Sequence, residues 1–508
     1  MKLSSEAFRR FYELHAWAGV VTGLVLYVMF LAGGFTLFHE PLERWEEPLA
    51  QRAFSTPRTL NAQLEDGLRA LGSMPQTLWF SPGDDVGEPH FDWQNEDGEW
   101  QAAHLDSTRG ALVMQRDHLA HFTYQLHYLW HELTGRWLYY VAGLLSLAWL
   151  LVIVSGVLIH LKDVVRQFHQ FRPQKRGRLF WADLHKVLSM MGLPFQTVFA
   201  YSGAFMVLGP LVAQLFVKPV FAGDLQRATK TALGYTLDAP EKPGAPATPM
   251  TVDALHARVS QLAPELNVTA YKFTNHGFDN GRFEVWGYER SEPHSREMLQ
   301  LDAVTGALVT RSTPGAMSTL RRWVMGLHFA QYGGLPVRVL MLLLTLASCL
   351  AILSGNWIWL SRRASSPRRK LSRLTVGVGA GAWVAFGALL FASRALPMSW
   401  AQRGGAEEVV FFASLAACML WAGLVRDERT LWWKQLALAA ALWVATPFLA
   451  AMHSTSGLFG HGPRDATVLA VDVAFLVCGL GLAATAWALS PASQRAPASI
   501  SAREVADA

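Results

Sequence analysis

Two segments of this chain share one pattern, and any fold has to accommodate both copies. Residues 126–162 read LHYLWHELTGRWLYYVAGLLSLAWLLVIVSGVLIHLK, and residues 327–362 read LHFAQYGGLPVRVLMLLLTLASCLAILSGNWIWLSR. In each copy Leu-His is followed by an arginine, an apolar span, Ser-Gly and a basic residue. This pattern predicts a duplicated unit, and each copy is long and apolar enough to contain a membrane-spanning helix.

The duplication extends to neighbouring segments. LDSTRGALV at 105–113 is matched by LDAVTGALV at 301–309, and both precede a Leu-His span. Two further spans begin at His15 and His185, and each carries a glycine, Gly33 or Gly203, eighteen residues after the histidine. Each half is therefore expected to contain a Leu-His span, an extramembrane module and a second Leu-His span.

Composition places the chain among integral membrane proteins with extramembrane domains. The 508 residues are 51% hydrophobic, and the mean hydropathy is +0.19, which is too apolar for an ordinary soluble enzyme. Apolar windows of about 20 residues predict eight spans, near residues 15–38, 137–160, 186–209, 337–360, 374–394, 408–425, 431–452 and 466–488. The three cysteines, Cys349, Cys418 and Cys478, all fall inside these spans, which argues against an iron–sulfur cluster, a zinc site or a disulfide framework.

Lysine and arginine residues predict the orientation. They gather before the first span and in the loops at 163–184 and 363–373, and loops rich in Lys and Arg face the cytoplasm. We therefore expect both termini in the cytoplasm and residues 39–126 and 211–327 on the outer side. This bias accounts for the net charge of +5, so the charge does not favour nucleic-acid binding.

The expected fold class is an α-helical membrane protein with a duplicated four-helix core, two small α+β modules outside the membrane and four appended helices. Helices at 60–71 and about 251–262 and strands at 77–80, 89–93, 100–105, 268–274, 282–288 and 297–301 predict the modules. Histidines His90, His104, His256, His276 and His294 are scattered over them, and we expect these at the surface. The expected boundaries are 1–38 (lead-in and first span), 39–126 (first module), 127–162 (second span), 163–184 (basic loop), 185–210 (third span), 211–327 (second module), 328–362 (fourth span), 363–373 (basic loop), 374–490 (four further spans) and 491–508 (tail).

Four histidines repeat with the spans. In an up-down bundle His15 and His185 open the two outward-running spans, whereas His127 and His328 precede the two inward-running ones. A single histidine at a membrane boundary is usually an interfacial residue, but two at one depth on facing helices match the two axial ligands of a six-coordinate haem. The sequence therefore predicts two b-type haems, one held by His15 with His185 and the other by His127 with His328.

Other residues join these sites as candidates. Arg136 and Arg338 lie near the outer histidines, against the positive-inside bias, and are expected to pair with haem propionates. His39, His131 and His160 are alternative ligands, because each lies at the end of a span or one turn from a repeated histidine. His121 also lies nearby but outside the repeat. No catalytic acid–base residue is predicted, and no Gly-rich dinucleotide fingerprint follows a strand.

Residues 8–365 resemble the PepSY-associated transmembrane family, through the duplicated Leu-His spans, the segment HFAQYGGLPVR at 328–338 and the modules that end in Asp-x-x-x-Gly. The family includes bacterial inner-membrane ferric-siderophore reductases with two haems in a four-helix core, and His15, His127, His185 and His328 fall at its recurring histidines. The chain departs from the family at His160, where tryptophan is common, and in residues 374–490, which have no counterpart in four-span members. The resemblance implies transfer of electrons across the inner membrane to reduce a ferric siderophore and release Fe(II) in the periplasm.

We therefore expect a haem-dependent ferric-siderophore or ferric-chelate reductase, which receives electrons from an unidentified cytoplasmic or membrane donor. Two other classes of protein remain open. One is a membrane scaffold or sensor whose outer modules bind a peptide or protease; a purified protein without haem absorbance would favour this class. The other is an iron-chelate transporter that uses the last four spans; uptake of a chelate by proteoliposomes without an electron donor would favour that class. The sequence does not identify the chelate, the donor or the role of residues 374–490.

Overall fold

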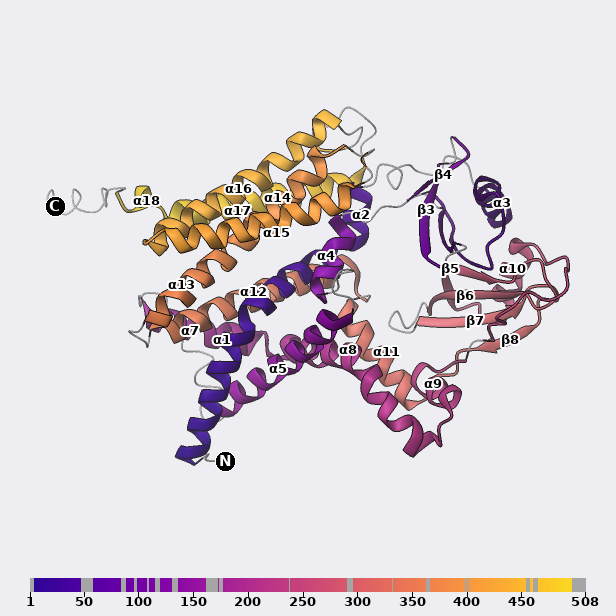
Figure 1. The fold of residues 1–508 in the computed structure, drawn as a ribbon, viewed down its shortest axis with the longest axis horizontal. Helices are drawn as coiled ribbons and strands as arrows, with labels where there is room; N and C mark the ends of the chain where they lie inside the picture. Colours follow the sequence, from indigo (N-terminus) through magenta and orange to yellow (C-terminus); the bar gives the residue numbers. More distant parts are fainter. Residues whose placement is uncertain are drawn as a thin grey trace, which may run out of the picture.

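The computed structural model combines a helical membrane part with one β-sheet (Figure 1). Within the described residues, seven helical stretches are long and apolar enough to cross a membrane: residues 5–36, 137–160, 193–221, 334–361, 369–395, 403–424 and 466–489. The structure describes residues 4–46, 58–83, 88–95, 98–106, 109–114, 119–129, 136–160, 172, 177–236, 238–289, 296–330, 332–361, 366–397, 400, 402–453, 457–459 and 465–495.

Four long helices form the core of the membrane part: α1 (Ser5–Thr36), α5 (Arg136–His160), α8 (Leu193–Phe221) and α12 (Gly334–Ser361). Helix α1 packs against both α5 and α12, and α5 packs against α8. These helices are apolar around most of their circumference, as helices in a bilayer must be. The predicted four-helix arrangement of the first 362 residues therefore has its counterpart in the structure.

Short helices that carry three of the repeated histidines precede the spans. His127 ends α4 (Leu119–His127), His185 lies on α7 (Arg178–Met191) and His328 lies on α11 (Ala316–Phe329). Two residues after His127 and His328, Leu129 and Ala330 have positive φ angles of 57° and 50°. This left-handed conformation interrupts a helix, so His127 and His328 lie on short helices that precede the apolar spans. For His185 the break lies at Gly192, between α7 and α8.

The two predicted modules form one domain, which we call the sheet domain. Its eight antiparallel strands have the order β4-β3-β2-β1-β5-β6-β7-β8, and β1 of the first half pairs directly with β5 of the second. The strands are β1 (Thr77–Ser81), β2 (His90–Gln94), β3 (Trp100–Asp106), β4 (Ala111–Met114), β5 (Leu266–Thr274), β6 (Arg282–Glu289), β7 (Arg296–Asp302) and β8 (Leu308–Arg311). The sequence analysis located six of them but did not predict β4, β8 or the pairing of the two halves.

Two helices cover the apolar face of the sheet and join the halves again. The helices α3 (Leu60–Leu71) and α10 (Val252–Leu262) pack over alternating apolar strand residues. The Asp253 carboxylate accepts the backbone N–H groups of Leu60 and Asn61 at the start of α3. In return the Asn61 side-chain oxygen accepts the N–H of Val252 at 3.4 Å. Each helix therefore receives an N-terminal cap from the other half of the duplication.

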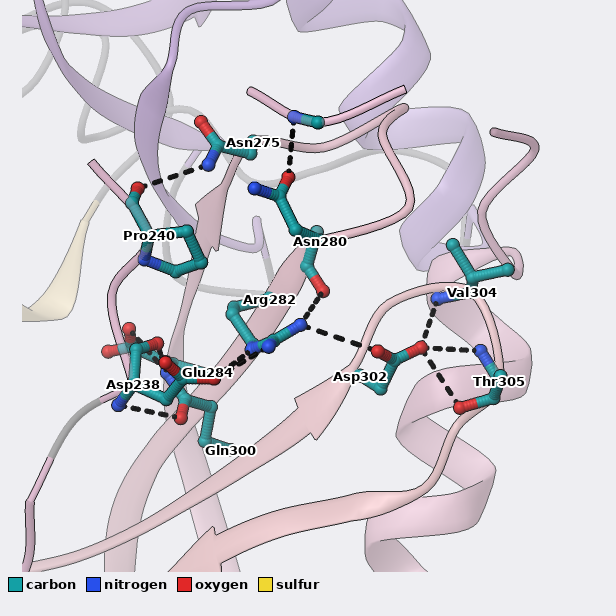
Figure 2. A network of polar contacts seen from close by, with 12 residues as sticks. Asp238, Pro240, Asn275, Asn280, Arg282, Glu284, Gln300, Asp302, Val304 and Thr305 are labelled. Carbon is teal, nitrogen blue, oxygen red and sulfur yellow. Dashed lines mark hydrogen bonds and ion pairs between the residues drawn. The ribbon is translucent and has the colours of Figure 1, made fainter. Parts of the chain in front are cut away.

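A polar network fixes the segment that enters the second half of the sheet (Figure 2). Arg282 Nη2 donates to Asp238 at 2.6 Å and Arg282 Nη1 donates to Asp302 at 3.3 Å. The backbone of Asp238 also exchanges hydrogen bonds with the buried side chain of Gln300. The Asp302 carboxylate accepts the N–H of Thr305 and so closes the turn before β8. This network attaches the linker after α9 (Leu225–Leu233) to the sheet.

The C-terminal helices form a layer along one flank of the core (Figure 1). They are α13 (Ser366–Gly379), α14 (Gly381–Ala395), α15 (Arg403–Leu424), α16 (Glu428–His453), α17 (Ala466–Leu489) and the short α18 (Pro491–Arg495). Helix α14 is central, because most of its span is buried against its neighbours. The eighth predicted span, near residues 431–452, corresponds to α16, which does not belong to the seven apolar helices among the described residues.

Hydrogen bonds attach this layer to the core at two places. Tyr27 of α1 donates its hydroxyl to Gly379 O at 2.7 Å and accepts the indole N–H of Trp383 at 3.0 Å. Trp45, on α2 (His39–Glu46), is fully buried and donates to Asp472 of α17 at 2.8 Å. The appended helices are therefore an integral part of the fold.

Candidate functional site

The structure brings the four repeated histidines together in the two pairs predicted from the sequence. The ring centres of His15 and His185 lie 6.1 Å apart, and those of His127 and His328 lie 6.0 Å apart. We call these the inner pair and the outer pair, after the membrane faces predicted for them. In Figure 1, α4 and α11 lie at the end of the bundle that faces the sheet domain, whereas α7 and the first turns of α1 lie toward the opposite end.

Backbone carbonyl groups fix three of the four rings. The Nδ1 atoms donate to the carbonyl oxygens of Val152, Met29 and Ala351, at 2.9 Å for His15, 2.9 Å for His127 and 2.8 Å for His185. Because a carbonyl oxygen only accepts hydrogen bonds, each of these rings carries its proton on Nδ1. The lone pair then lies on Nε2, which is the tautomer that a metal-ligating histidine needs.

The fourth ring has a side-chain partner instead. His328 Nδ1 lies 2.6 Å from Ser202 Oγ on α8. The Ser202 hydroxyl donates its own proton to Val198 O at 2.6 Å, so it accepts from His328. This ring therefore has the same tautomer as the other three. Ser202 is a site residue that the sequence analysis missed, although it directly precedes the repeated Gly203.

Glycines on the facing helices make room for three of the rings. A Cβ atom on Gly33 would lie 2.8 Å from His127 Cε1, one on Gly156 would lie 3.0 Å from His15 Cε1, and one on Gly355 would lie 3.1 Å from His185 Cε1. Each glycine follows the accepting carbonyl by four residues, which is about one helical turn. The repeated Ser-Gly motif thus has a physical role, because its glycine lets an imidazole lie against the backbone of the neighbouring helix.

The pair geometry fits a metal held between two imidazoles. An imidazole nitrogen binds a metal at about 2 Å, so two rings on opposite sides of one metal have ligating nitrogens about 4 Å apart and centres somewhat further apart. Among the described residues, no group of three or more His, Cys, Asp and Glu side chains forms a metal site. A bare ion would thus find only two protein ligands at each pair, whereas a haem supplies four nitrogens of its own.

Two unsatisfied donors in the bundle also fit bound groups. Asn356 directly follows Gly355, beside the inner pair, and is 2% exposed, and its Nδ2 atom has no hydrogen-bond partner within the described residues. Nε1 of Trp149 on α5, whose ring packs against Phe30, also has no partner there. Buried donors normally have partners, so an acceptor such as a haem propionate or a water molecule suits each place.

Of the other predicted residues, His39 and Arg338 have partners outside the two pairs, whereas His160 lies close to His185. His39 forms an ion pair with Glu43 at 3.8 Å and packs edge-on against Tyr124. His160 is the last residue of α5, one turn beyond Gly156, and His121 bonds to Gln125. Arg338 pairs with Glu40 at 3.4 Å, Arg136 begins α5, and His131 lies outside the described residues.

The fold and the site are those of a multi-pass membrane protein. Its duplicated helical core contains two pairs of histidines, and a sheet domain joins the two halves. The family described as PepSY-associated TM region matches residues 12–362. The chain belongs to this family, which confirms the resemblance seen in the sequence. A Pseudomonas aeruginosa protein described as uncharacterized is 30% identical over 367 residues, which cover 68% of this chain and 89% of that protein.

Proposed function

We propose that this protein carries electrons across the bacterial inner membrane through two haems and reduces a ferric siderophore or another ferric chelate in the periplasm. The observation that carries the proposal is the approach of four repeated histidines in two pairs with the same ring tautomer. Each electron converts one Fe(III) chelate to Fe(II), and the donor is a separate cytoplasmic or membrane component.

Haem, when bound, supplies a one-electron couple. His15 and His185 would hold one haem, and His127 and His328 the other. The hydrogen bonds at Nδ1 fix ring orientation and make the ligating nitrogens more basic. The buried apolar core around the rings keeps water from the sites and so helps to set their potentials.

The separation of the pairs suits transfer across a membrane. His15 and the carbonyl of Met29, which binds His127, are 29 − 15 = 14 residues apart on α1, or about 21 Å at 1.5 Å per residue. Phe30, which directly follows Met29, packs against Trp149 of α5 with ring centres 5.8 Å apart. Two haems at these depths would divide electron transfer across the bilayer into shorter steps.

The first experiment measures haem in detergent-purified full-length protein. A dithionite-reduced minus oxidised spectrum and a pyridine haemochrome assay are recorded for the wild type, His127→Ala and His185→Ala, with His39→Ala as a control from outside the pairs. We expect b-type bands and about two haems per chain in the wild type and the control, and about one in each pair variant.

Reduction of ferric chelates by the pre-reduced protein, followed with a ferrous-specific chromophore, then tests the activity. A folded wild-type protein without haem would overturn the proposal and favour a scaffold or a transporter. If the haem content is normal but ferric chelates do not oxidise the reduced haems, the electron-transfer part of the proposal stands and ferric chelates are excluded as substrates.

A further inference from the structure

A third pair of histidines lies in the sheet domain, away from the bundle. His90 on β2 and His104 on β3 are directly opposite in the antiparallel register. Their ring centres are 4.7 Å apart, with the ring planes at 60°. Phe91 and Ala103 are the neighbours of these histidines along β2 and β3, and both are buried on the apolar side of the sheet. Because side chains alternate along a strand, His90 and His104 lie on the face opposite to α3 and α10. Neither histidine has a role in the haem sites.

Ring nitrogens of this pair remain without a well-formed hydrogen bond. His90 Nδ1 and the ring nitrogens of His104 are buried and make no bond of good geometry among the described residues, and the backbone of Glu88 lies beside the His104 ring. Nearly all buried polar atoms in proteins are hydrogen-bonded, so these nitrogens require an explanation. A bound group that accepts lone pairs from imidazole nitrogens provides one.

Asp92 orients the more exposed ring. His90 Nε2 lies 3.1 Å from Asp92 Oδ1, and because a carboxylate only accepts, Nε2 carries the proton. The lone pair of His90 is then on the buried Nδ1, on the side of the ring away from Asp92. A carboxylate bonded to one nitrogen of an imidazole is the usual support of a metal-ligating histidine.

The histidine pair is open to solvent on one side. Solvent reaches the pair past His90, whose side chain is 21% exposed, and past Asp92, which is 39% exposed. An ion is therefore able to enter and leave.

We propose that His90 and His104 bind one divalent first-row transition-metal ion on the sheet domain, with Asp92 as the positioning residue. Imidazole ligands suit Zn²⁺, Cu²⁺, Ni²⁺ and Fe²⁺ rather than Mg²⁺ or Ca²⁺. No third His, Cys, Asp or Glu completes the site within the described residues, so water or another small ligand takes the open positions. Such a site exchanges its ion, in contrast to a closed four-ligand structural site. The inference is independent of the proposed haems.

The test uses the full-length protein as purified, at pH 7. Equilibrium dialysis against Zn²⁺ with elemental analysis compares the wild type with His90→Gln/His104→Gln, Asp92→Asn and the control His276→Gln, which replaces a buried histidine elsewhere in the same sheet domain. We expect the double variant to lose one zinc per chain and the control to lose none. Asp92→Asn should weaken zinc binding by about 10- to 100-fold.

Electron paramagnetic resonance of added Cu²⁺ checks the ligands in the wild type and does not depend on the folding of a variant. Nitrogen hyperfine structure from two imidazoles is expected for the first equivalent of copper. Copper bound without nitrogen ligands in the wild type, or zinc binding unchanged in the double variant, would overturn the proposal.

Discussion

Contact between an imidazole and a helix backbone is the smallest unit of the candidate site. A helix carbonyl normally accepts only the N–H four residues later, and a side chain at that later residue would cover it. Where the later residue is glycine, an imidazole from the next helix reaches the same carbonyl. This occurs at Met29 with Gly33, Val152 with Gly156 and Ala351 with Gly355.

A single added methyl group should therefore disturb a histidine pair. In Gly33→Ala the new Cβ would lie 2.8 Å from both Cε1 and Nδ1 of His127, so the ring has to move away from Met29. We expect the haem content to fall from about two toward one per chain. Gly19→Ala on the same helix is the matched control, because nothing lies within 4 Å of its Cβ. Equal haem content in the two variants would contradict this explanation of the glycine.

Ser202 offers a finer adjustment of the outer pair. Ser202→Ala removes the acceptor of His328 Nδ1–H, and the histidine becomes a weaker electron donor through Nε2. A hydrogen bond worth about 0.5–1.5 kcal/mol corresponds to roughly 20–60 mV for one electron. The midpoint potential of the haem proposed at the outer pair should rise by about this amount in a redox titration, with the haem content unchanged. A lower potential would show that the hydroxyl plays a different role.

At the scale of elements, local pattern was enough to predict most helices and strands. The helix at 60–71 has the predicted bounds, because Thr59 caps its first turn and Gly72 ends it with a φ of 85°. The helix break at Leu129 was not predictable, since neither glycine nor proline marks it. The alternation of apolar and polar residues along β1 does not reveal that its partner is β5, because the two strands lie far apart in the sequence. Ser202 was missed for a similar reason, since its partner lies on another helix.

The turn between β5 and β6 contains a titratable group that links stability of the sheet domain to pH. Burial lowers the pKa of His276 to about 4, compared with about 6.5 in an unfolded chain. Protons therefore favour the unfolded chain between these values, so stability falls as the pH drops from about 6.5 to 4 and is constant above 6.5.

In His276→Gln the loss of stability between pH 6.5 and pH 4 should be smaller, by up to about 1.4 kcal/mol per pH unit. Part of the loss remains, because burial also lowers the pKa of His104. Thermal unfolding followed by circular dichroism at pH 5 and pH 7 compares the two proteins. The difference between the two melting temperatures should be smaller in the variant. An unchanged difference would mean that His276 is protonated equally in the folded and unfolded chain.

At the scale of the whole molecule, the appended helices and the core share one apolar interior. Phe35 of α1 stacks on Phe386 of α14 at 4.7 Å, and Cys349 of α12 lies in the same cluster. Tyr27 adds hydrogen bonds to both ends of the α13–α14 junction. The layer therefore supports the helix that carries His15.

Tyr27→Phe should loosen this attachment without removing a haem ligand. It removes the hydroxyl donor to Gly379 O and leaves the Trp383 indole N–H without its acceptor, which costs about 1–3 kcal/mol for a buried group. We expect a lower melting temperature in detergent but about two haems per chain. A double-mutant cycle with Trp383→Phe isolates the shared bond. Additive effects of the two changes would show that this bond does not join the layer to α1.

The pairing of β1 with β5 has a consequence for biosynthesis. Strand β1 ends at Ser81 and β5 begins at Leu266, so 265 − 81 = 184 residues lie between the end of one partner and the start of the other. At roughly 5–20 residues per second, the open edge of β1 waits about 10–40 s for its neighbour, and an unpaired edge invites association with other chains. The nascent first half therefore needs shielding until the second half has been synthesised.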